Sequence, residues 1–209
     1  MVEKLNNKTF EFKDLTIELH PDVYEPAEDT FQLIEAIQLK RDDKVLEIGT
    51  GCGLISLICA KKGANVVCTD INPIAVELTK KNNLMNQNKL NGVLDVRLGD
   101  LFSVIDKFEL FDIIVFNPPY LPTKPDERVL NDWHEKALDG GPDGLLQTKR
   151  FLEKVSDYLE KDGCGYFVFS SLSDRKKLEK YLTDAKLKYK IINSYKYNDE
   201  ILDVYFFKK

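Results

Sequence analysis

Short apolar runs alternate with segments of helical periodicity along most of the chain. A continuous apolar run predicts a buried strand, and apolar residues three and four positions apart predict an amphipathic helix. Strands are predicted in this way at residues 44–48, 65–69, 93–98, 111–116, 166–169, 189–195 and 202–207. Helices are predicted between them at 54–62, from Pro73 to Asn91-Gly92, from Leu145 to about Gly163, and at 173–185.

This alternation of strands and helices decides the expected fold class. It implies right-handed crossover connections and a parallel sheet with helices on both faces. The last two strands are joined only by the short turn Asn198-Asp199-Glu200, which permits an antiparallel pair. We therefore expect an α/β fold with a seven-stranded, mostly parallel sheet and an antiparallel last strand.

The first 40 residues are interpreted as an N-terminal arm packed on this core. Apolar and polar residues alternate loosely over 10–19, which predicts an edge strand or a hairpin, and a helix follows over 28–39. The arm either covers the sheet edge or contributes to a substrate site. At 209 residues, the chain is expected to form a single domain made of the arm, 1–40, and a core, 41–209.

Composition restricts the partners of the protein. The formal net charge is -5 and the sequence pI is near 5.2, so the broad basic field that binds duplex nucleic acid is missing, although a local basic face remains compatible with these numbers. Four cysteines without a CxxC spacing, and only two histidines, disfavour disulfides and a metal site. The sequence shows no signal peptide and no apolar run of membrane-spanning length, so we expect a cytoplasmic protein.

The tetrapeptide Asn117-Pro118-Pro119-Tyr120 directly follows the predicted strand 111–116. A residue before proline is held extended, which here aims the Asn117 side chain and the Pro118 carbonyl the same way. Two neighbouring acceptors would hold both hydrogens of an NH2 group and leave the nitrogen lone pair free to attack, while Tyr120 stacks on the planar group. A strand followed by an ordinary Asn-Pro turn is the plainer interpretation.

A glycine-rich turn, Glu47-Ile48-Gly49-Thr50-Gly51-Cys52-Gly53, joins the first predicted core strand to its helix. Glycines let the main chain approach a ligand closely, and a helix N-terminus offers free amide hydrogens. The spacing differs from the dinucleotide fingerprint, which needs a later third glycine to seat a pyrophosphate. Because Glu47 would repel a diphosphate, the turn favours a ligand with an ammonium or sulfonium group over NAD.

Two acidic residues follow the next two predicted strands. Asp70 is placed to accept from both ribose hydroxyls of an adenosine group. Asp100 is placed to accept from an adenine amine while Leu101 packs on the ring. Each one alone is more simply a loop carboxylate. The carboxyl ends of parallel strands meet at one sheet edge, however, so we expect the glycine-rich turn, both acids and the tetrapeptide to form one site.

These residues resemble the Rossmann-like, class I methyltransferases that depend on S-adenosylmethionine. Two longer segments narrow the resemblance to the HemK family in its short archaeal and eukaryotic form. They are residues 22–31, with the run Tyr24-Glu25-Pro26-Ala27-Glu28-Asp29-Thr30, and residues 137–144, with a Gly-Gly-x-x-Gly pattern. The resemblance covers roughly residues 22 to 170, and the run from Tyr24 to Thr30 is much more specific than the glycine-rich turn.

The resemblance implies an enzyme that methylates the side-chain nitrogen of the glutamine in the Gly-Gly-Gln motif of class-I translation termination factors. It implies that 41–209 is the catalytic domain and that Asn117, Pro118 and Tyr120 are catalytic, with Pro119 completing the substrate-binding tetrapeptide. The implied cofactor-binding residues are Thr30, Glu47, Gly49, Gly51, Asp70, Ile71, Asp100, Leu101 and Asn117. Since an amide must be aligned rather than deprotonated before transfer, we expect His134 to be a loop or packing residue.

The resemblance also implies a second partner, a small zinc-binding activator that covers an apolar sheet edge. Residues 93–98 are the candidate edge, and a simply covered edge strand is the alternative. About 40 residues precede the first core strand, so the N-terminal docking domain of the longer bacterial relatives is not expected. The segment 121–144 exceeds a plain connection and is a candidate for substrate contact, with Asp139, Gly140 and Gly141 at the entrance.

Two other functions stay open at this point. The two neighbouring acceptors at Asn117 and Pro118 also fit the exocyclic amine of adenine or guanine in RNA or DNA. A nucleobase methyltransferase would need a basic and aromatic surface around the pocket for a flipped base. The basic candidates near the rim are Lys124, Arg128, Lys136 and Lys149. The other possibility is a cofactor-binding module without turnover.

Overall fold

The structure is a computed structural model that describes residues 8–124, 126 and 132–209. The main strands are β3 Lys44–Ile48, β4 Asn65–Asp70, β5 Val93–Leu98, β6 Phe111–Phe116, β7 Leu159–Ser170, β8 Lys188–Tyr197 and β9 Glu200–Lys208. The helices are α1 Glu28–Ala36, α2 Leu54–Lys61, α3 Pro73–Asn86, α4 Trp133–Leu138, α5 Leu146–Leu152, α6 Val155–Tyr158 and α7 Arg175–Asp184, with a short 3-10 turn, η1, at Gln87–Lys89. A small hairpin, β1 Thr9–Phe12 and β2 Leu15–Glu18, precedes them.

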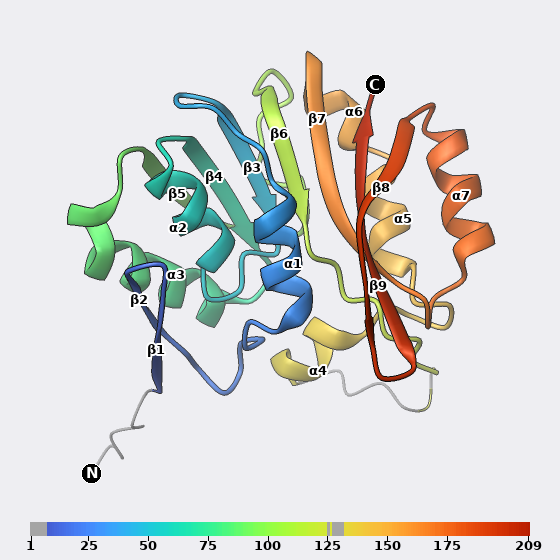
Figure 1. Cartoon of the computed structure of the whole chain (residues 1–209), viewed down its shortest axis with the longest axis horizontal. Helices are drawn as coiled ribbons and strands as arrows, with labels where there is room; N and C mark the ends of the chain where they lie inside the picture. Colours follow the sequence, from blue (N-terminus) through green and yellow to red (C-terminus); the bar gives the residue numbers. More distant parts are fainter. Residues whose placement is uncertain (1–7, 125, 127–131) are drawn as a thin grey trace.

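One seven-stranded sheet forms the centre of the molecule, in the order β5-β4-β3-β6-β7-β9-β8 (Figure 1). The strands from β5 to β7 are parallel, and β9 lies antiparallel between β7 and β8. The expected α/β class, with a mostly parallel sheet and an antiparallel last strand, is confirmed. The carboxyl ends of β3, β4, β5 and β6 consequently meet at one edge of the sheet.

Helices cover both faces of this sheet. One face packs against the hairpin, α1, α2 and α3 through a core that includes Leu33, Leu57 and Val115. The other face packs against α5, α6 and α7 through a core that includes Phe151 and Phe167. Burial on both faces explains why the central strands are continuous apolar runs rather than alternating patterns.

The N-terminal hairpin is a separate two-stranded sheet and not an edge strand of the main one. Two asparagines of α3 bind the main chain of the hairpin, as a neighbouring strand would do. Asn86 accepts from the Thr16 amide at 3.0 Å and donates to the Thr16 carbonyl at 2.7 Å. Asn82 does the same with Glu18, at 2.9 and 3.0 Å, and its Nδ2 also donates to the Cys52 carbonyl at 2.8 Å. These buried amides tie the arm to α3 and to the glycine-rich turn.

The largest departure from the sequence expectation lies between Leu145 and Gly163, where the single predicted helix is wrong. The structure has the separate helices α5 and α6, and β7 already begins at Leu159. Leu159 pairs with Phe111 and Cys164 pairs with Ile113, so residues 160–163 bulge out of the ladder. Leu159 fits the helical period after Val155 as well as it fits a strand, and periodicity therefore misplaces the start of β7.

The remaining elements differ from expectation mainly at their ends. The first helix, α1, stops at Ala36 instead of residue 39, because Ile37 takes an extended conformation.

All four cysteines are free, as their spacing predicts. In the part of the chain that the structure describes, no helix is long and apolar enough to cross a membrane, and no cluster of His, Cys, Asp or Glu could hold a metal ion.

Candidate active site

A cavity of about 390 Å³ lies at the carboxyl ends of β3, β4, β5 and β6. Its volume falls in the usual range for small-molecule sites. All the residues expected to be catalytic, cofactor-binding or part of the substrate-binding tetrapeptide line it, namely Thr30, Glu47, Gly49, Gly51, Asp70, Ile71, Asp100, Leu101, Asn117, Pro118, Pro119 and Tyr120. The parallel sheet and the helix α1 packed on it thus bring together residues that are up to 90 positions apart in the sequence, from Thr30 to Tyr120.

The turn after β3 depends on glycines in the left-handed conformation. Gly49, Gly51 and Gly53 have φ angles of 68°, 58° and 86°. The amides of Gly49 and Thr50 both donate to the Thr69 carbonyl, at 2.8 and 3.0 Å, which closes the turn against the end of β4. A Cβ on Gly53 would lie 2.8 Å from Thr79 Cγ2. The first two glycines therefore shape the cavity wall, while the third allows α2 to begin close to α3.

Glu47 lies at the end of β3 with its carboxylate buried. Its Oε2 accepts from Thr50 Oγ1 at 3.0 Å, from the Ser56 amide at 3.0 Å, and from Ser56 Oγ. Burial raises the pKa of the Glu47 carboxyl to about 8, although the hydrogen bonds from Ser56 and Thr50 act in the opposite direction. A nearby cation would favour the charged form. The group therefore suits a positively charged ligand.

Asp70 ends β4, and its carboxylate accepts from main-chain amides of the glycine-rich turn and of the segment that follows β4. Its Oδ2 accepts from the Gly51 amide at 2.9 Å, and its Oδ1 accepts from the Asn72 amide at 2.8 Å. Burial raises the pKa of Asp70, and the hydrogen bonds from Asn72 and Gly51 oppose that shift. Each carboxylate oxygen has a second lone pair, so Asp70 can still accept from a pair of hydroxyl groups.

Asp100 makes an ion pair that the sequence did not suggest. Arg150 of α5 donates through Nη2 to Asp100 Oδ2 at 2.6 Å and through Nη1 to Asp100 Oδ1 at 3.2 Å. Both residues line the cavity. The two lie 50 positions apart and on different elements, and sequence spacing carries no signal for such a pair.

Asn117 follows β6 and points its two amide atoms at different surroundings. Its Nδ2 donates to Asp29 Oδ2 at 3.0 Å. A carboxylate at this distance can only accept, so the amide orientation is fixed with Oδ1 on the other side. Within the described ranges, Oδ1 is buried and has no hydrogen-bond partner. A buried acceptor without a partner costs about 1–3 kcal/mol, and a ligand donor in the cavity would remove that cost.

Asp29 lines the cavity and lies at the centre of the hydrogen bonds around the tetrapeptide, and it is not among the site residues expected from the sequence. Its buried carboxylate accepts from Tyr24 Oη at 3.1 Å, from Tyr120 Oη at 3.2 Å and from the Thr30 amide at 2.6 Å, in addition to Asn117. Burial raises the pKa of both tyrosines and the charge of Asp29 raises it further, so both hydroxyls remain donors. The only signal for Asp29 was its position inside the segment 22–31.

The segment 137–144 supports the tetrapeptide from behind. A Cβ on Gly140 would lie 2.8 Å from the Tyr120 carbonyl carbon, and one on Gly144 would lie 2.5 Å from the Tyr120 carbonyl oxygen. Ser173 Oγ donates to that same oxygen at 2.8 Å. The Gly-Gly-x-x-Gly pattern therefore serves close packing against the main chain at Tyr120. Asp139 lines the cavity, whereas Gly140 and Gly141 are buried and are not among its lining residues.

Of the basic residues expected near the rim, some line the cavity and others do not. Lys136 lines the cavity with its Nζ 4.3 Å from the Trp133 ring centre. Lys149 pairs instead with Glu153 at 3.7 Å, and neither Lys149 nor Lys124 is a lining residue. Arg128 lies outside the described residues. His134 belongs to α4 but does not line the cavity either.

The arrangement has two chemically distinct groups of residues. Glu47, Asp70 and Asp100 offer carboxylates for a cation, for hydroxyl groups and for an amine. Asn117 offers a fixed acceptor beside Pro118 and Tyr120. The cavity therefore suits a polar adenosine-like ligand beside a planar NH2 group.

Comparison with known proteins finds methyltransferases among the relatives of this chain. Residues 25–139 match the family model described as methyltransferase small domain. The chain is 45% identical over 169 residues to a putative protein N5-glutamine methyltransferase of Methanocaldococcus jannaschii, covering 79% of this chain and 81% of that protein. It is 38% identical over 156 residues to methyltransferase HEMK2 of Homo sapiens, covering 70% of this chain and 71% of that protein.

A relative with a different acceptor and a solved structure complete the comparison. The chain is 32% identical over 158 residues to a tRNA1(Val) (adenine(37)-N6)-methyltransferase of a Flavobacteriaceae bacterium, covering 75% of this chain and 64% of that protein. Its fold resembles the E. cuniculi Mtq2–Trm112 complex, described as responsible for methylation of the eRF1 translation termination factor. That likeness has a TM-score of 0.69 and 25% identity, and covers 90% of this chain and 99% of that one.

Proposed function

Because the chain belongs to the methyltransferase small domain family and has protein N5-glutamine methyltransferases among its relatives, we propose that it methylates a glutamine side-chain amide. The methyl donor is S-adenosylmethionine, and the acceptor is the glutamine of the Gly-Gly-Gln motif in a class-I translation termination factor. The observation that carries this proposal is the buried, unpartnered Oδ1 of Asn117 in the cavity wall. Such a factor acts in the cytosol, so the proposal places the enzyme there.

The residues of the cavity fit the cofactor. Asp70 would accept from the ribose hydroxyls, Asp100 with Leu101 would hold the adenine, and Glu47 would face the ammonium group. The other lining residues expected around it are Thr30, Gly49, Gly51 and Ile71. When bound, the cofactor supplies an electrophilic methyl group on a sulfonium sulfur.

The tetrapeptide would position the glutamine amide. Asn117 Oδ1 would accept one amide hydrogen and the Pro118 carbonyl the other, with Tyr120 forming a wall of the site. The amide nitrogen is a poor nucleophile because its lone pair is delocalised, so alignment carries the reaction. Such positioning contributes about 7–11 kcal/mol in favourable cases. The acceptor nitrogen would gain the methyl group as the bond from that methyl to the sulfonium sulfur breaks and a neutral thioether is released. Asn117 Oδ1 would stabilise the positive charge that grows on the nitrogen, and the surplus proton would leave afterwards.

Charges around the tetrapeptide favour a protein acceptor over a nucleobase. Burial is the largest cause of the raised pKa of Tyr24 and of Tyr120. The negative charge of Glu28 raises the pKa of Tyr24 further, and that of Glu200 raises the pKa of Tyr120 further. These acids would repel a phosphate backbone. Of the four basic residues that are candidates for a nucleic-acid surface, Lys136 lines the cavity, Lys124 and Lys149 do not, and Arg128 lies outside the described residues.

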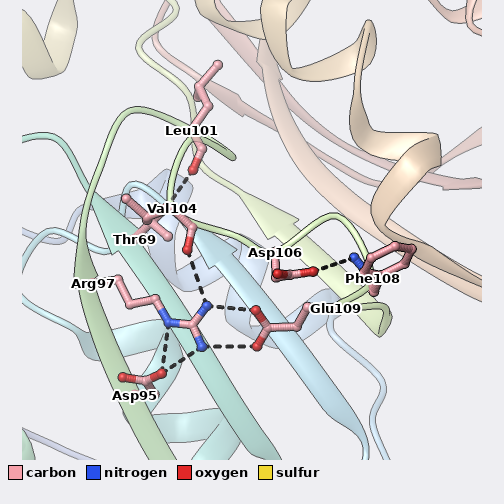
Figure 2. Close-up of polar contacts among 8 residues, drawn as sticks. All are labelled: Thr69, Asp95, Arg97, Leu101, Val104, Asp106, Phe108 and Glu109. Atoms are coloured by element: carbon pink, nitrogen blue, oxygen red, sulfur yellow. Dashed lines mark hydrogen bonds and ion pairs between the residues drawn. The ribbon is translucent and has the colours of Figure 1, made fainter.

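The β5 edge is the proposed docking site for a small activator protein, which would be of the zinc-binding kind. Val93 and Leu98 are 63% and 53% exposed at its two ends, and Phe108 in the following loop is 80% exposed. On the same strand, Arg97 donates to both oxygens of Glu109 at 2.7 and 3.0 Å and to Asp95 at 2.8 Å (Figure 2). A partner strand could pair with this open edge. The Mtq2 of the similar structure is in complex with Trm112.

The test of the proposed function is transfer of a labelled methyl group. The purified chain, alone and co-expressed with a candidate activator, is supplied with labelled cofactor and a termination factor, its Gln→Ala mutant, RNA or DNA. We expect label on the factor and none on the mutant factor. Label on nucleic acid but not on the factor would overturn the proposal in favour of a nucleobase methyltransferase.

Two controls make the result interpretable. Enzyme carrying Asn117→Ala should transfer no label to any acceptor, which excludes a contaminating activity. Cofactor binding measured by calorimetry on the same preparation separates an enzyme that lacks its activator from one that lacks a cofactor site. Binding without transfer to any acceptor, even with the activator present, would support the non-catalytic module instead.

A further inference from the structure

Asp100 and Arg150 form an ion pair within the wall of the cavity. Arg150 reaches Asp100 from α5 and also donates through Nη1 to Gln147 Oε1 at 2.8 Å. All three side chains line the cavity. The guanidinium is therefore held on one side by its own helix and spans, on the other, both oxygens of the carboxylate.

The loop that carries Asp100 is already held on its opposite side. Leu101 has a φ of 51°, an uncommon conformation for a non-glycine residue. Thr69 Oγ1 of β4 donates to the Leu101 carbonyl at 3.2 Å (Figure 2), and the Asp100 amide donates to Ser103 Oγ at 3.0 Å. The main chain is thus fixed by β4 and by the loop itself. The orientation of the Asp100 carboxylate remains to be set by Arg150.

A two-point contact removes the rotational freedom of a carboxylate. Arginine presents a rigid planar pair of donors that matches the two carboxylate oxygens, which a lysine cannot do. Each oxygen of Asp100 keeps another lone pair after it accepts from Arg150. Asp100 is consequently a preset acceptor, because two N–H groups of Arg150 hold its two oxygens.

We propose that Arg150 is a positioning residue that makes the purine end of the cofactor site selective for a 6-amino group. A fixed carboxylate accepts from an amine but repels a 6-oxo group, which presents an acceptor of its own. This inference rests on the proposed function, since it takes the cavity to be an S-adenosylmethionine site with the adenine near Asp100.

The neighbouring ion pair on the same helix provides a matched control. Lys149 pairs with Glu153 at 3.7 Å, and neither residue lines the cavity. Loss of that pair removes a partly exposed basic residue from α5, as loss of Arg150 does, but leaves Asp100 untouched. A purely structural role for Arg150 would therefore affect stability without changing ligand preference.

The test compares two ligands that differ only at the purine 6-position. Calorimetry measures the affinity of S-adenosylhomocysteine and of its deaminated analogue, S-inosylhomocysteine, for wild type, Arg150→Ala, Arg150→Lys and Lys149→Ala. We expect Arg150→Ala to weaken the adenosyl ligand about tenfold and the inosyl ligand much less, so that the preference falls. Arg150→Lys should lie in between, and Lys149→Ala should match wild type. In the Asp100→Ala background, Arg150→Ala should change the preference no further.

Each outcome decides the matter. An unchanged ratio of the two affinities in Arg150→Ala, whether both ligands weaken equally or neither does, would overturn the role of Arg150. Tighter binding of the adenosyl ligand by Arg150→Ala would overturn it as well, because Arg150 would then compete for Asp100. A wild-type protein that binds neither ligand would contradict the proposed function itself, together with this inference.

Discussion

Asn117 Nδ2 donates to Asp29 Oδ2 at 3.0 Å, and this single contact fixes which end of the Asn117 amide lines the acceptor side of the cavity. The two residues are 88 positions apart and come from α1 and from the end of β6. An asparagine without such a partner exchanges its two ends freely at little cost. Asp29 therefore determines that Asn117 presents an acceptor, and not a donor, on the side away from Asp29.

Asn117→Ala removes that acceptor. We expect methyl transfer to fall below detection, because one hydrogen of the acceptor amide loses its partner and its alignment, while cofactor affinity stays within a few fold. Labelled transfer and calorimetry with S-adenosylhomocysteine measure the two effects separately. If cofactor binding disappears together with activity, Asn117 would belong to the cofactor site more than to the acceptor site.

Asp29→Asn tests the orientation of Asn117. The substituted amide places donor hydrogens among the groups that now donate to Asp29, including Asn117 and Tyr120. We expect kcat to fall by about 10- to 100-fold, the value of one or two hydrogen bonds at a buried site, with little change in cofactor affinity. Glu35→Gln, an exposed substitution on the same helix, is the control. Equal losses in both variants would contradict the assigned role.

Glu47 should make stability depend on pH. Burial raises the pKa of its carboxyl in the folded protein to about 8, above the ordinary value of 4.5. Between those values the folded state holds a proton that the unfolded state has lost, so the free energy of unfolding must fall as pH rises through this range. Above about pH 8 the loss is complete.

The variant Glu47→Gln has no proton to lose at this position. Denaturant unfolding at pH 5 and pH 9 should show that the stability of Glu47→Gln relative to wild type increases at the higher pH. Glu77→Gln, at an exposed site of α3, serves as the control and should leave the pH profile unchanged. A relative stability of Glu47→Gln that is constant or decreases with pH would contradict the raised pKa.

Leu98→Asp tests the β5 edge. A charge at this exposed apolar position should prevent the activator from binding, since burying it in an interface is costly. We expect loss of the complex in co-expression and size-exclusion chromatography, with cofactor binding retained. Ile192→Asp on β8, at the opposite edge of the sheet, should leave the complex intact. An activator that resists the first change and not the second would place its docking site on β8.

Sequence patterns predicted the sheet well, since buried parallel strands are continuous apolar runs. The bounds of β3, β5 and β6 agree with the predicted ones. The predictions failed where one residue satisfied two patterns. Leu159 continues the apolar face of α6 and also begins β7, and only its pairing with Phe111 decides between them.

The site was predictable to the extent that its residues end consecutive strands. Glu47 and Asp70 lie at the carboxyl ends of β3 and β4, Asp100 and Asn117 come just after β5 and β6, and the carboxyl ends of neighbouring parallel strands converge. Asp29 and Arg150 come from helices outside that rule. Their roles depend on how α1 and α5 pack on the sheet, which local spacing does not record.

The side chain of Asn82 has a consequence for how the molecule unfolds. Its amide serves the hairpin at Glu18 and the glycine-rich turn at Cys52 together, and Asn86 serves the hairpin at Thr16. Detaching the hairpin would break the hydrogen bonds that Asn82 and Asn86 make to Glu18 and Thr16, and it would leave the Asn82 amide that bonds Cys52 without the partners that hold it, which would loosen the glycine-rich turn. Arm and core should therefore melt in one cooperative transition, and a ligand bound far from the hairpin should slow hydrogen exchange within it.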